Sequence, residues 1–251
     1  MRFASLGSGS RGNAMLVETG STCVMVDCGF SITETEKRLA RLGRSPEELS
    51  AILVTHEHSD HIRGVLPFAR RHTIPVWMTH GTAATLPEGE LPPLHSIAGY
   101  ADFHVGDIHV QPYPVPHDAR EPCQFLFHGG RHRLGLLTDC GSLTPHIVAT
   151  LQGCDALVLE FNHDPEMLAR GSYPPALKRR VGGDYGHLNN HQARRLLDQI
   201  ELGPLQHLVA AHLSEKNNAP ERVREQLDVF DGRLDYSLAC QDGGFDWRTL
   251  E

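Results

Sequence analysis

Thr55-His56-Glu57-His58-Ser59-Asp60-His61 is a histidine-rich stretch that lies between two predicted elements of regular structure. The apolar run 51–54 before it predicts a short buried strand, and residues 62–72 after it predict a helix. On an extended strand end, His56 and His58 point the same way because side chains alternate along a strand. The stretch therefore places two imidazoles side by side at the carboxyl end of a buried strand.

Asp60 and His61 follow where the chain turns into the helix, so they can be directed toward a second point nearby. Three imidazoles and a carboxylate within six residues suit two adjacent divalent metals. Zinc and manganese are the main candidates, and nitrogen and oxygen ligands also accept iron. Chance could bring three of the 17 histidines together, but chance does not predict matching ligands elsewhere in the chain.

Matching candidates do occur, each directly at or after the end of another predicted strand. The strands 107–115, 133–139 and 205–211 lead to His117, Asp139 and His212 respectively. Asp27 likewise follows the predicted strand 23–26, and an acid at the end of a buried strand indicates a site. We expect Asp27 to accept a hydrogen bond from a ligand imidazole and to fix its tautomer.

The composition is that of an ordinary globular protein, with 40% hydrophobic and 22% charged residues. We expect residues 1–251 to form a single domain with a large core. The sequence lacks a signal-peptide pattern and a membrane-length apolar run, which predicts a cytoplasmic protein without a membrane partner. Six scattered cysteines without a C-x-x-C pair are expected to be buried thiols. The net charge of −8 argues against a basic surface coat, although not against a local basic patch.

Strand-rich and helical stretches alternate along the chain, and the order strand–helix–strand around residues 51–78 is typical of α/β layering. Residues 81–100 read as irregular to helical, and a strand at 234–240 is expected to be the last element. Residues 165–186 are interrupted by Pro165, Pro174, Pro175 and Gly182-Gly183 around Lys178-Arg179-Arg180, and they read as a surface excursion. Such a charge run is usually solvated, with substrate contact as the alternative.

The order of these residues resembles that of the metallo-β-lactamase superfamily, over nearly the whole chain. The resemblance implies an α/β fold, the αββα four-layer sandwich, with two metals at one edge of the sheets. It assigns His56, His58 and His117 to one metal and Asp60, His61 and His212 to the other. Asp139 would bridge the two.

A finer resemblance is to the YycJ/WalJ-type branch of that superfamily. It rests on Ser5-Leu6-Gly7-Ser8-Gly9-Ser10-Arg11-Gly12-Asn13, Glu160-x-Asn162-His163-Asp164, Gly186-His187-Leu188-Asn189-Asn190 and His212-Leu213-Ser214-x-x-Asn217-Asn218. The branch is associated with cleavage of DNA as a 5′ exonuclease. Asn189 departs from the pattern, which has serine there.

The expected enzyme is thus a binuclear metal-dependent hydrolase that acts on DNA through a hydroxide shared by two cations. Asp60 and His187 are the expected catalytic residues, with His187 protonating the leaving oxygen; a helix-capping or packed surface role for His187 is the alternative. His163 is expected to lie behind the metal ligands. The expected phosphate contacts are Ser10, Arg11, Asn13, Ser214, Asn217 and Asn218, although the glycine-rich loop and the loop after His212 could equally be simple turns.

Other reactions use the same ligands. A carboxylic ester, thioester or lactone, or a small cyclic phosphodiester, is the alternative substrate. A di-iron redox protein of this fold usually has Glu where His58 stands, together with a flavin domain, and an RNA-processing relative would carry an inserted domain. A binding module without metal would be expected to lack ligands, and none of the ligands is missing here.

Overall fold

Two mixed sheets form the centre of the computed structural model, which describes residues 1–87, 92–98, 100–230 and 232–251. Within these residues, the first sheet has the order β14-β1-β2-β3-β4-β5-β6 and the second β13-β12-β11-β10-β9-β8-β7. The first contains β1 (Arg2–Gly7), β2 (Ala14–Thr19), β3 (Thr22–Val26), β4 (Ala51–Leu53), β5 (Val76–Thr79), β6 (Leu94–Ile97) and β14 (Phe245–Thr249). The second contains β7 (Phe103–Val105), β8 (Ile108–Pro114), β9 (Cys123–Gly129), β10 (His132–Leu137), β11 (Ala156–Glu160), β12 (His207–Ala211) and β13 (Tyr236–Leu238).

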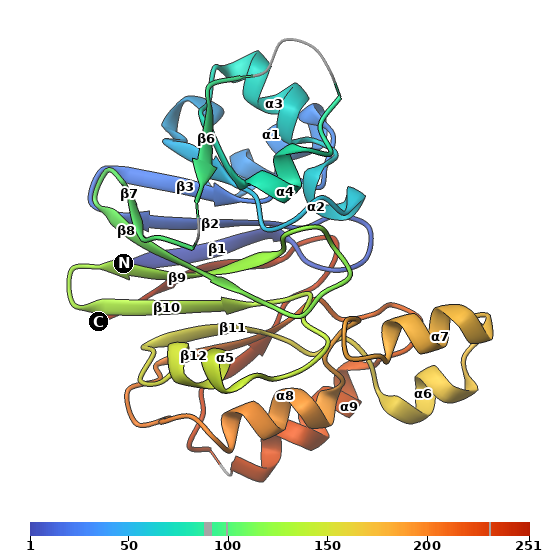
Figure 1. Ribbon diagram of the computed structural model, residues 1–251. Helices are drawn as coiled ribbons and strands as arrows, with labels where there is room; N and C mark the ends of the chain where they lie inside the picture. Colours follow the sequence, from blue (N-terminus) through green and yellow to red (C-terminus); the bar gives the residue numbers. More distant parts are fainter. Residues whose placement is uncertain (88–91, 99, 231) are drawn as a thin grey trace.

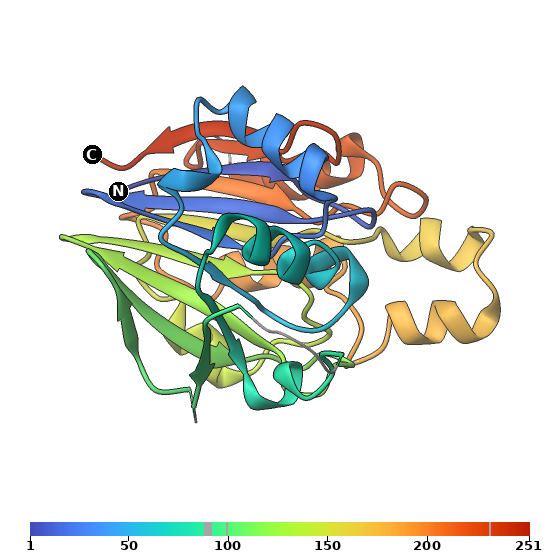
Figure 2. The ribbon, with the colours of Figure 1, turned by 90° about the horizontal axis from the view of Figure 1, so that it is seen from above.

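Helices cover the outer face of each sheet (Figure 1). Beside the first sheet lie α1 (Ile32–Arg41), the short turn Pro46–Glu48, α2 (Ser59–Ile62), α3 (Val65–His72) and α4 (His80–Ala83). Beside the second lie α5 (Pro145–Thr150), α8 (Asn190–Leu197), α9 (Pro220–Leu227) and the turn Asp228–Phe230. Two further helices, α6 (Pro165–Arg170) and α7 (Pro175–Val181), project beyond the sandwich (Figures 1 and 2).

The layers follow from side-chain alternation in strands that are apolar on both faces. In β2, Val17 joins the core between the sheets, whereas Leu16 packs in the cluster that includes Leu39 of α1. In β9, Phe127 lies in the inter-sheet core and Leu126 in the cluster on the side of α5 and α8. Each sheet therefore buries both of its faces, and the expected αββα sandwich is confirmed.

Four local expectations need correction. The single helix expected at 62–72 is divided at Gly64, where a Cβ atom would lie 1.9 Å from the carbonyl oxygen of Phe30, so the backbones there meet closely. Residues 81–100 contain the unexpected strand β6, while the part of that expectation at 88–91 and 99 lies outside the described residues. The excursion 165–186 contains α6 and α7, and the chain continues past 240 into β14.

The missed strand β14 pairs antiparallel with β1, so long-range pairing rather than local pattern defines it. All six cysteines are free thiols, and five of them are buried. Among the residues that the structure describes, every helix is too short or too polar to cross a membrane.

Candidate metal centre

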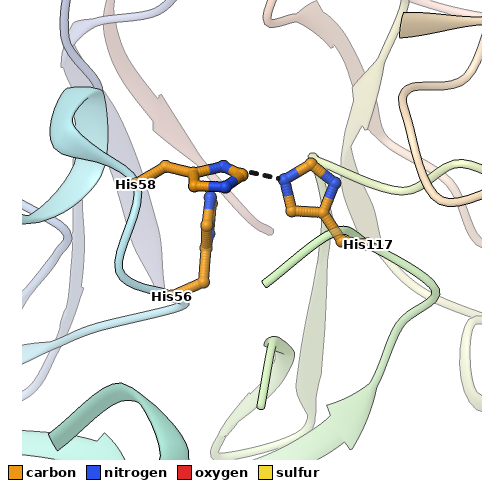
Figure 3. A group of neighbouring side chains, drawn as sticks. All are labelled: His56, His58 and His117. Carbon is orange, nitrogen blue, oxygen red and sulfur yellow. Dashed lines mark hydrogen bonds between the residues drawn. The ribbon is translucent and has the colours of Figure 1, made fainter. Parts of the chain in front are cut away.

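Three imidazoles meet where the ends of the two sheets approach each other (Figure 3). His56 and His58 come from the extended segment between β4 and α2, and His117 comes from the loop that follows β8. One ring nitrogen of each lies within 4.8 Å of the other two. Nδ1 of His58 and Nε2 of His117 are 3.1 Å apart. The structure thus brings together the three residues that the family resemblance assigns to one metal.

A second group forms beside the first. Asp60 in the first turn of α2, His61 next to it and His212 after β12 also place one ligand atom each within 4.8 Å of the others. Oδ2 of Asp60 lies 3.4 Å from Nε2 of His61 and 3.7 Å from Nε2 of His212. These distances suit three ligands around one cation, because each atom can reach a common point between them.

Asp139 lies between the two groups. Its Oδ2 is 3.3 Å from Nε2 of His61, and its Oδ1 is 4.0 Å from Nε2 of His117 and 3.5 Å from Nε2 of His212. Asp139 follows β10, and its side chain is almost fully buried. A single carboxylate therefore contacts both groups, as a bridging ligand must.

The backbone is unusual at three of these strand ends. Asp27, Asp139 and His212 have φ angles of 59°, 51° and 56°, in the left-handed region that non-glycine residues rarely adopt. This conformation turns each side chain out of the strand direction at the same edge of the sandwich. Residues in such conformations cluster at functional sites, where the surrounding structure holds the strain.

The donor set fits divalent cations. Within the described residues, Nε2 of His56, Nε2 of His212 and Oδ2 of Asp139 are buried without a hydrogen-bond partner. Leaving buried polar atoms unpaired is costly, so these three atoms call for a ligand. Nitrogen and carboxylate oxygen atoms around a small volume are ligands that zinc, manganese and iron accept.

The pKa shifts of two histidines also favour cations at this centre. Burial lowers the pKa of His61, but the carboxylates of Asp139, Asp27 and Asp60 outweigh it and raise this pKa well above its usual value. Burial likewise opposes a charged His212, yet Asp139 and its other acidic neighbours raise the pKa of His212 to about 10. The buried carboxylates thus demand positive charge at this position, and cations can supply it while the imidazoles bind in their neutral form.

The far sides of two of these imidazoles, those of His61 and His117, are held by hydrogen bonds from their Nδ1 atoms. Nδ1 of His61 donates to Oδ2 of Asp27 at 2.8 Å, as the sequence predicted for Asp27, and Asp27 also accepts from the backbone N and Oγ1 of Thr55. Nδ1 of His117 donates to the carbonyl oxygen of Gly186 at 3.0 Å. Because Nδ1 carries the proton in both rings, Nε2 keeps the free lone pair that a metal requires.

Glu160 is the functional residue that sequence reasoning missed. It is fully buried at the end of β11, and its Oε1 lies 2.9 Å from Nδ1 of His187 and 3.3 Å from Nδ1 of His212. The signal was present, since Ala156-Leu157-Val158-Leu159-Glu160 is an apolar strand that ends in an acid. The carboxylate of Glu160 lies behind His187 and His212. The expected place of His163 behind the ligands stays a prediction, and its Nδ1 has no hydrogen-bond partner in the described part of the chain.

The centre opens into a cavity of about 350 Å³. Its walls combine proposed ligands, residues of the segment 173–187 and three serines. The lining residues are Ser10, His58, Ser59, Asp60, Asp118, Asp139, Asn162, Tyr173, Leu177, Arg180, Val181, Gly186, His187, His212 and Ser214. Ser10, Ser214 and His187 thus reach the space where a substrate would bind.

Four other expected substrate contacts do not line this cavity, as far as the described residues show. Nδ2 of Asn13 instead donates to Oδ2 of Asp60 at 3.3 Å, and Asn13 is buried. Asn217 and Asn218 are also buried, and the amide of Asn218 pairs with that of Asn190 at 2.9 Å. The amides of Asn13 and Asn218 thus hydrogen bond within the protein, whereas Oδ1 of Asn217 is buried without a partner among the described residues. The expected contact of these three side chains with phosphate stays a prediction.

Arg11 is the fourth of these residues. Its guanidinium is exposed and forms ion pairs with Glu215 at 2.8 Å and Asp242 at 3.0 Å. Two carboxylates beside one guanidinium offset its charge, so the glycine-rich loop does not present a free cation to the cavity. The expected contact of Arg11 with phosphate stays a prediction.

Comparisons with known proteins agree with this geometry. A family model described as "Beta-lactamase superfamily domain" matches residues 22–213. Exodeoxyribonuclease YycJ of Bacillus anthracis is 36% identical over 230 residues, which cover 89% of this chain and 86% of that protein. Exodeoxyribonuclease WalJ of Streptococcus pneumoniae serotype 2 (strain D39) is 33% identical over 226 residues, with 88% and 84% covered.

Solved structures show the same fold. The metallo-β-lactamase fold protein YhfI of Bacillus subtilis superposes with a TM-score of 0.75 over 99% of both chains, at 16% identity. This likeness concerns the fold alone, whereas the sequence relatives extend to the family. The chain belongs to the metallo-β-lactamase superfamily and, within it, to the YycJ/WalJ family of metal-dependent hydrolases.

Proposed function

We propose that this hydrolase is a nuclease that releases nucleotides from DNA ends, as a 5′ exonuclease. The observation that carries the proposal is the pair of ligand groups joined by Asp139 at the floor of an open cavity. The exodeoxyribonuclease names of two relatives that align with more than four-fifths of this chain support DNA as the substrate.

In this proposal, His56, His58 and His117 hold one divalent cation, and Asp60, His61 and His212 hold the other. The carboxylate of Asp139 lies between these two groups and would be shared by the cations. Zinc or manganese is the expected metal, and iron is also compatible. When bound, two such cations generate a nucleophile from water near neutral pH and offset the negative charge that develops on the phosphate. Proton donation to the leaving oxygen and binding of the phosphate are assigned to the side chains described next.

His187 supplies the proton in this proposal. Its Nδ1 donates to Glu160, so Nε2 is the atom left to face a substrate in the cavity that His187 lines. Burial lowers the pKa of His187, but the carboxylate of Glu160 outweighs it and raises this pKa above its usual value. A protonated Nε2 can then donate to the leaving oxygen, which otherwise departs as a poor leaving group.

Asp60 holds its carboxylate toward the cavity with help from the glycine-rich loop. Nδ2 of Asn13 donates to Oδ2 of Asp60, and the backbone N of Asn13 donates to the carbonyl oxygen of Asp60 at 2.8 Å. Both contacts fix the first turn of α2 against residues 7–13. The loop thereby positions a ligand carboxylate, and Ser10 and Ser214 remain as neutral donors for phosphate oxygens.

The direct test is digestion of DNA labelled at the 5′ or the 3′ end, as single strand and as duplex, by metal-free protein reloaded with manganese or zinc. We expect metal-dependent release of nucleotides from the 5′ end, absent in Asp60→Ala and retained in the exposed control Asp246→Ala. Intact DNA with both metals bound, together with turnover of a thioester, a lactone or a cyclic phosphodiester, would overturn the DNA assignment. Full activity of Asp60→Ala would overturn the site.

A further inference from the structure

Residues 165–186 form an arm that stands out from the sandwich (Figures 1 and 2). The arm comprises α6, the loop between the two helices, α7 and the turn that leads to His187. It carries four basic residues, Arg170, Lys178, Arg179 and Arg180, but only two acidic ones, Glu166 and Asp184. In a chain with a net charge of −8 this is a local positive excess, which suits a polyanion.

The arm and the sandwich both contribute residues to the lining of the same cavity. The arm contributes Tyr173, Leu177, Arg180 and Val181, whereas the sandwich contributes proposed metal ligands and serines. The arm therefore supplies an aromatic ring, apolar side chains and one cation, and the sandwich supplies candidate metal ligands and hydroxyl groups that can donate to phosphate oxygens. A nucleotide has the same division, because its base is flat and weakly polar and its phosphate is charged.

Tyr173 is well placed to receive a base. It lies between α6 and α7, where Pro174 and Pro175 restrict the backbone that follows it. The ammonium of Lys216 lies 5.8 Å from the centre of its ring, which contributes a cation–π contact from the loop after His212. The ring is half-buried and borders the cavity, so a base can lie against it.

Arg180 is anchored at the rim beside the centre. Its Nε donates to Oδ2 of Asp118, the neighbour of His117. Within the described residues no hydrogen bond engages its two terminal nitrogen atoms, and its side chain is 56% exposed. A guanidinium that is oriented through Nε and keeps its terminal N–H groups available matches the geometry of a phosphate.

We propose that the arm binds the terminal nucleotide of a single DNA strand, with the base stacked on Tyr173 and a backbone phosphate bound by Arg180. The inference rests on the proposed nuclease function and adds the surface that selects the strand end. The cavity of about 350 Å³ lies at the lower end of the range for ligand pockets, roughly 300–1,000 Å³. It accordingly takes one nucleotide, and the end of a duplex must open before it enters.

The stacking step is tested with two single-stranded substrates for the metal-loaded enzyme: one with a normal terminal nucleotide and one whose terminal nucleotide lacks the base. On the normal strand, we expect Tyr173→Ala to raise KM roughly 5- to 150-fold, which corresponds to about 1–3 kcal/mol of base–aromatic stacking. Tyr173→Phe keeps the ring and should resemble wild type. Tyr185→Ala removes a tyrosine of the same arm that is 66% exposed and does not line the cavity, and it should also resemble wild type.

The abasic strand separates stacking from a loss of structure. Without a base to stack, wild type and Tyr173→Ala should have equal KM values, and unchanged turnover of this strand by the variant shows that the centre is intact. An equal rise in KM on both strands, or no rise on the normal strand, would overturn the stacking role. A wild-type enzyme that leaves both strands intact would instead overturn the nuclease proposal itself, and the inference with it.

The phosphate contact has its own readout. Loss of one phosphate contact to a single strand lowers the slope of log KM against log salt by about 0.7. We expect this change for Arg180→Gln, which can still hydrogen bond to Asp118, and not for the matched control Arg179→Gln, since Arg179 does not line the cavity. Equal slopes for wild type and Arg180→Gln would remove Arg180 from the proposal.

Discussion

Replacement of Asp27 by asparagine tests whether the residue behind His61 controls metal binding. Asp27 accepts three hydrogen bonds at 2.8 Å: Oδ1 from the backbone N of Thr55, and Oδ2 from Oγ1 of Thr55 and Nδ1 of His61. Asparagine tolerates the positive φ of 59° at this position as well as aspartate does. The variant therefore changes the hydrogen bonding with little change to the backbone.

The magnitude follows from the two orientations open to the new amide. With its NH2 toward the backbone N of Thr55, two donors face each other, and an unsatisfied buried N–H destabilises the fold by about 1–3 kcal/mol. With its NH2 toward His61, the ring proton must move from Nδ1 to Nε2, the atom that would bind metal. Loss of such a supporting partner weakens metal binding by roughly 10- to 100-fold, which is about 1.4–2.7 kcal/mol.

Two measurements distinguish the orientations. Competition with a chromophoric chelator gives the affinity for each metal, and urea unfolding of the metal-free protein gives the free energy of unfolding. We expect at least one of them to fall by these amounts in Asp27→Asn, and neither to change in Asp246→Asn, whose carboxylate is 87% exposed. Wild-type metal affinity together with a wild-type free energy of unfolding would refute the role given to Asp27.

Glu160→Gln should lower kcat, as measured by steady-state kinetics, and an unchanged kcat would contradict the role of Glu160. Oε2 of Glu160 accepts from the backbone N of both Cys140 and Leu188. If the new amide nitrogen takes the place of Oε2, urea unfolding should show a loss of about 2–6 kcal/mol in the free energy of unfolding. His187→Ala should slow hydrolysis of a DNA phosphodiester far more than that of a nitrophenyl phosphodiester, because nitrophenolate leaves without a proton; equal losses on the two substrates would exclude the proton donation. Protein with free metal at about 100 times Kd gains about 2.7 kcal/mol of stability from one occupied site, so removal of the metal by a chelator should lower Tm by roughly 5–11 °C. Calorimetry with and without the chelator measures this shift, and an identical Tm would argue that the native fold binds no metal at the centre.

Much of the fold was predictable because its strands are short apolar runs with local boundaries. Strands such as 14–19 and 156–160 bury residues on both faces, and their pattern alone indicates buried strands. The helices of the arm escaped prediction because proline and glycine interrupt the segment, although Pro175 in fact begins α7. The strand β14 escaped because its partner, β1, lies at the opposite end of the chain.

The stretch 55–61 determined by itself that His56, His58, Asp60 and His61 would lie together, because the spacing of side chains at a strand end and a helix start is a local property. What meets them was decided by the packing of the two sheets. That packing brings Glu160 behind His187 and His212, turns Asn13 toward Asp60 and pairs Asn218 with Asn190. Nothing in the spacing of these residues distinguishes a substrate contact from a structural one, since a buried amide binds whichever partner the tertiary structure presents to it.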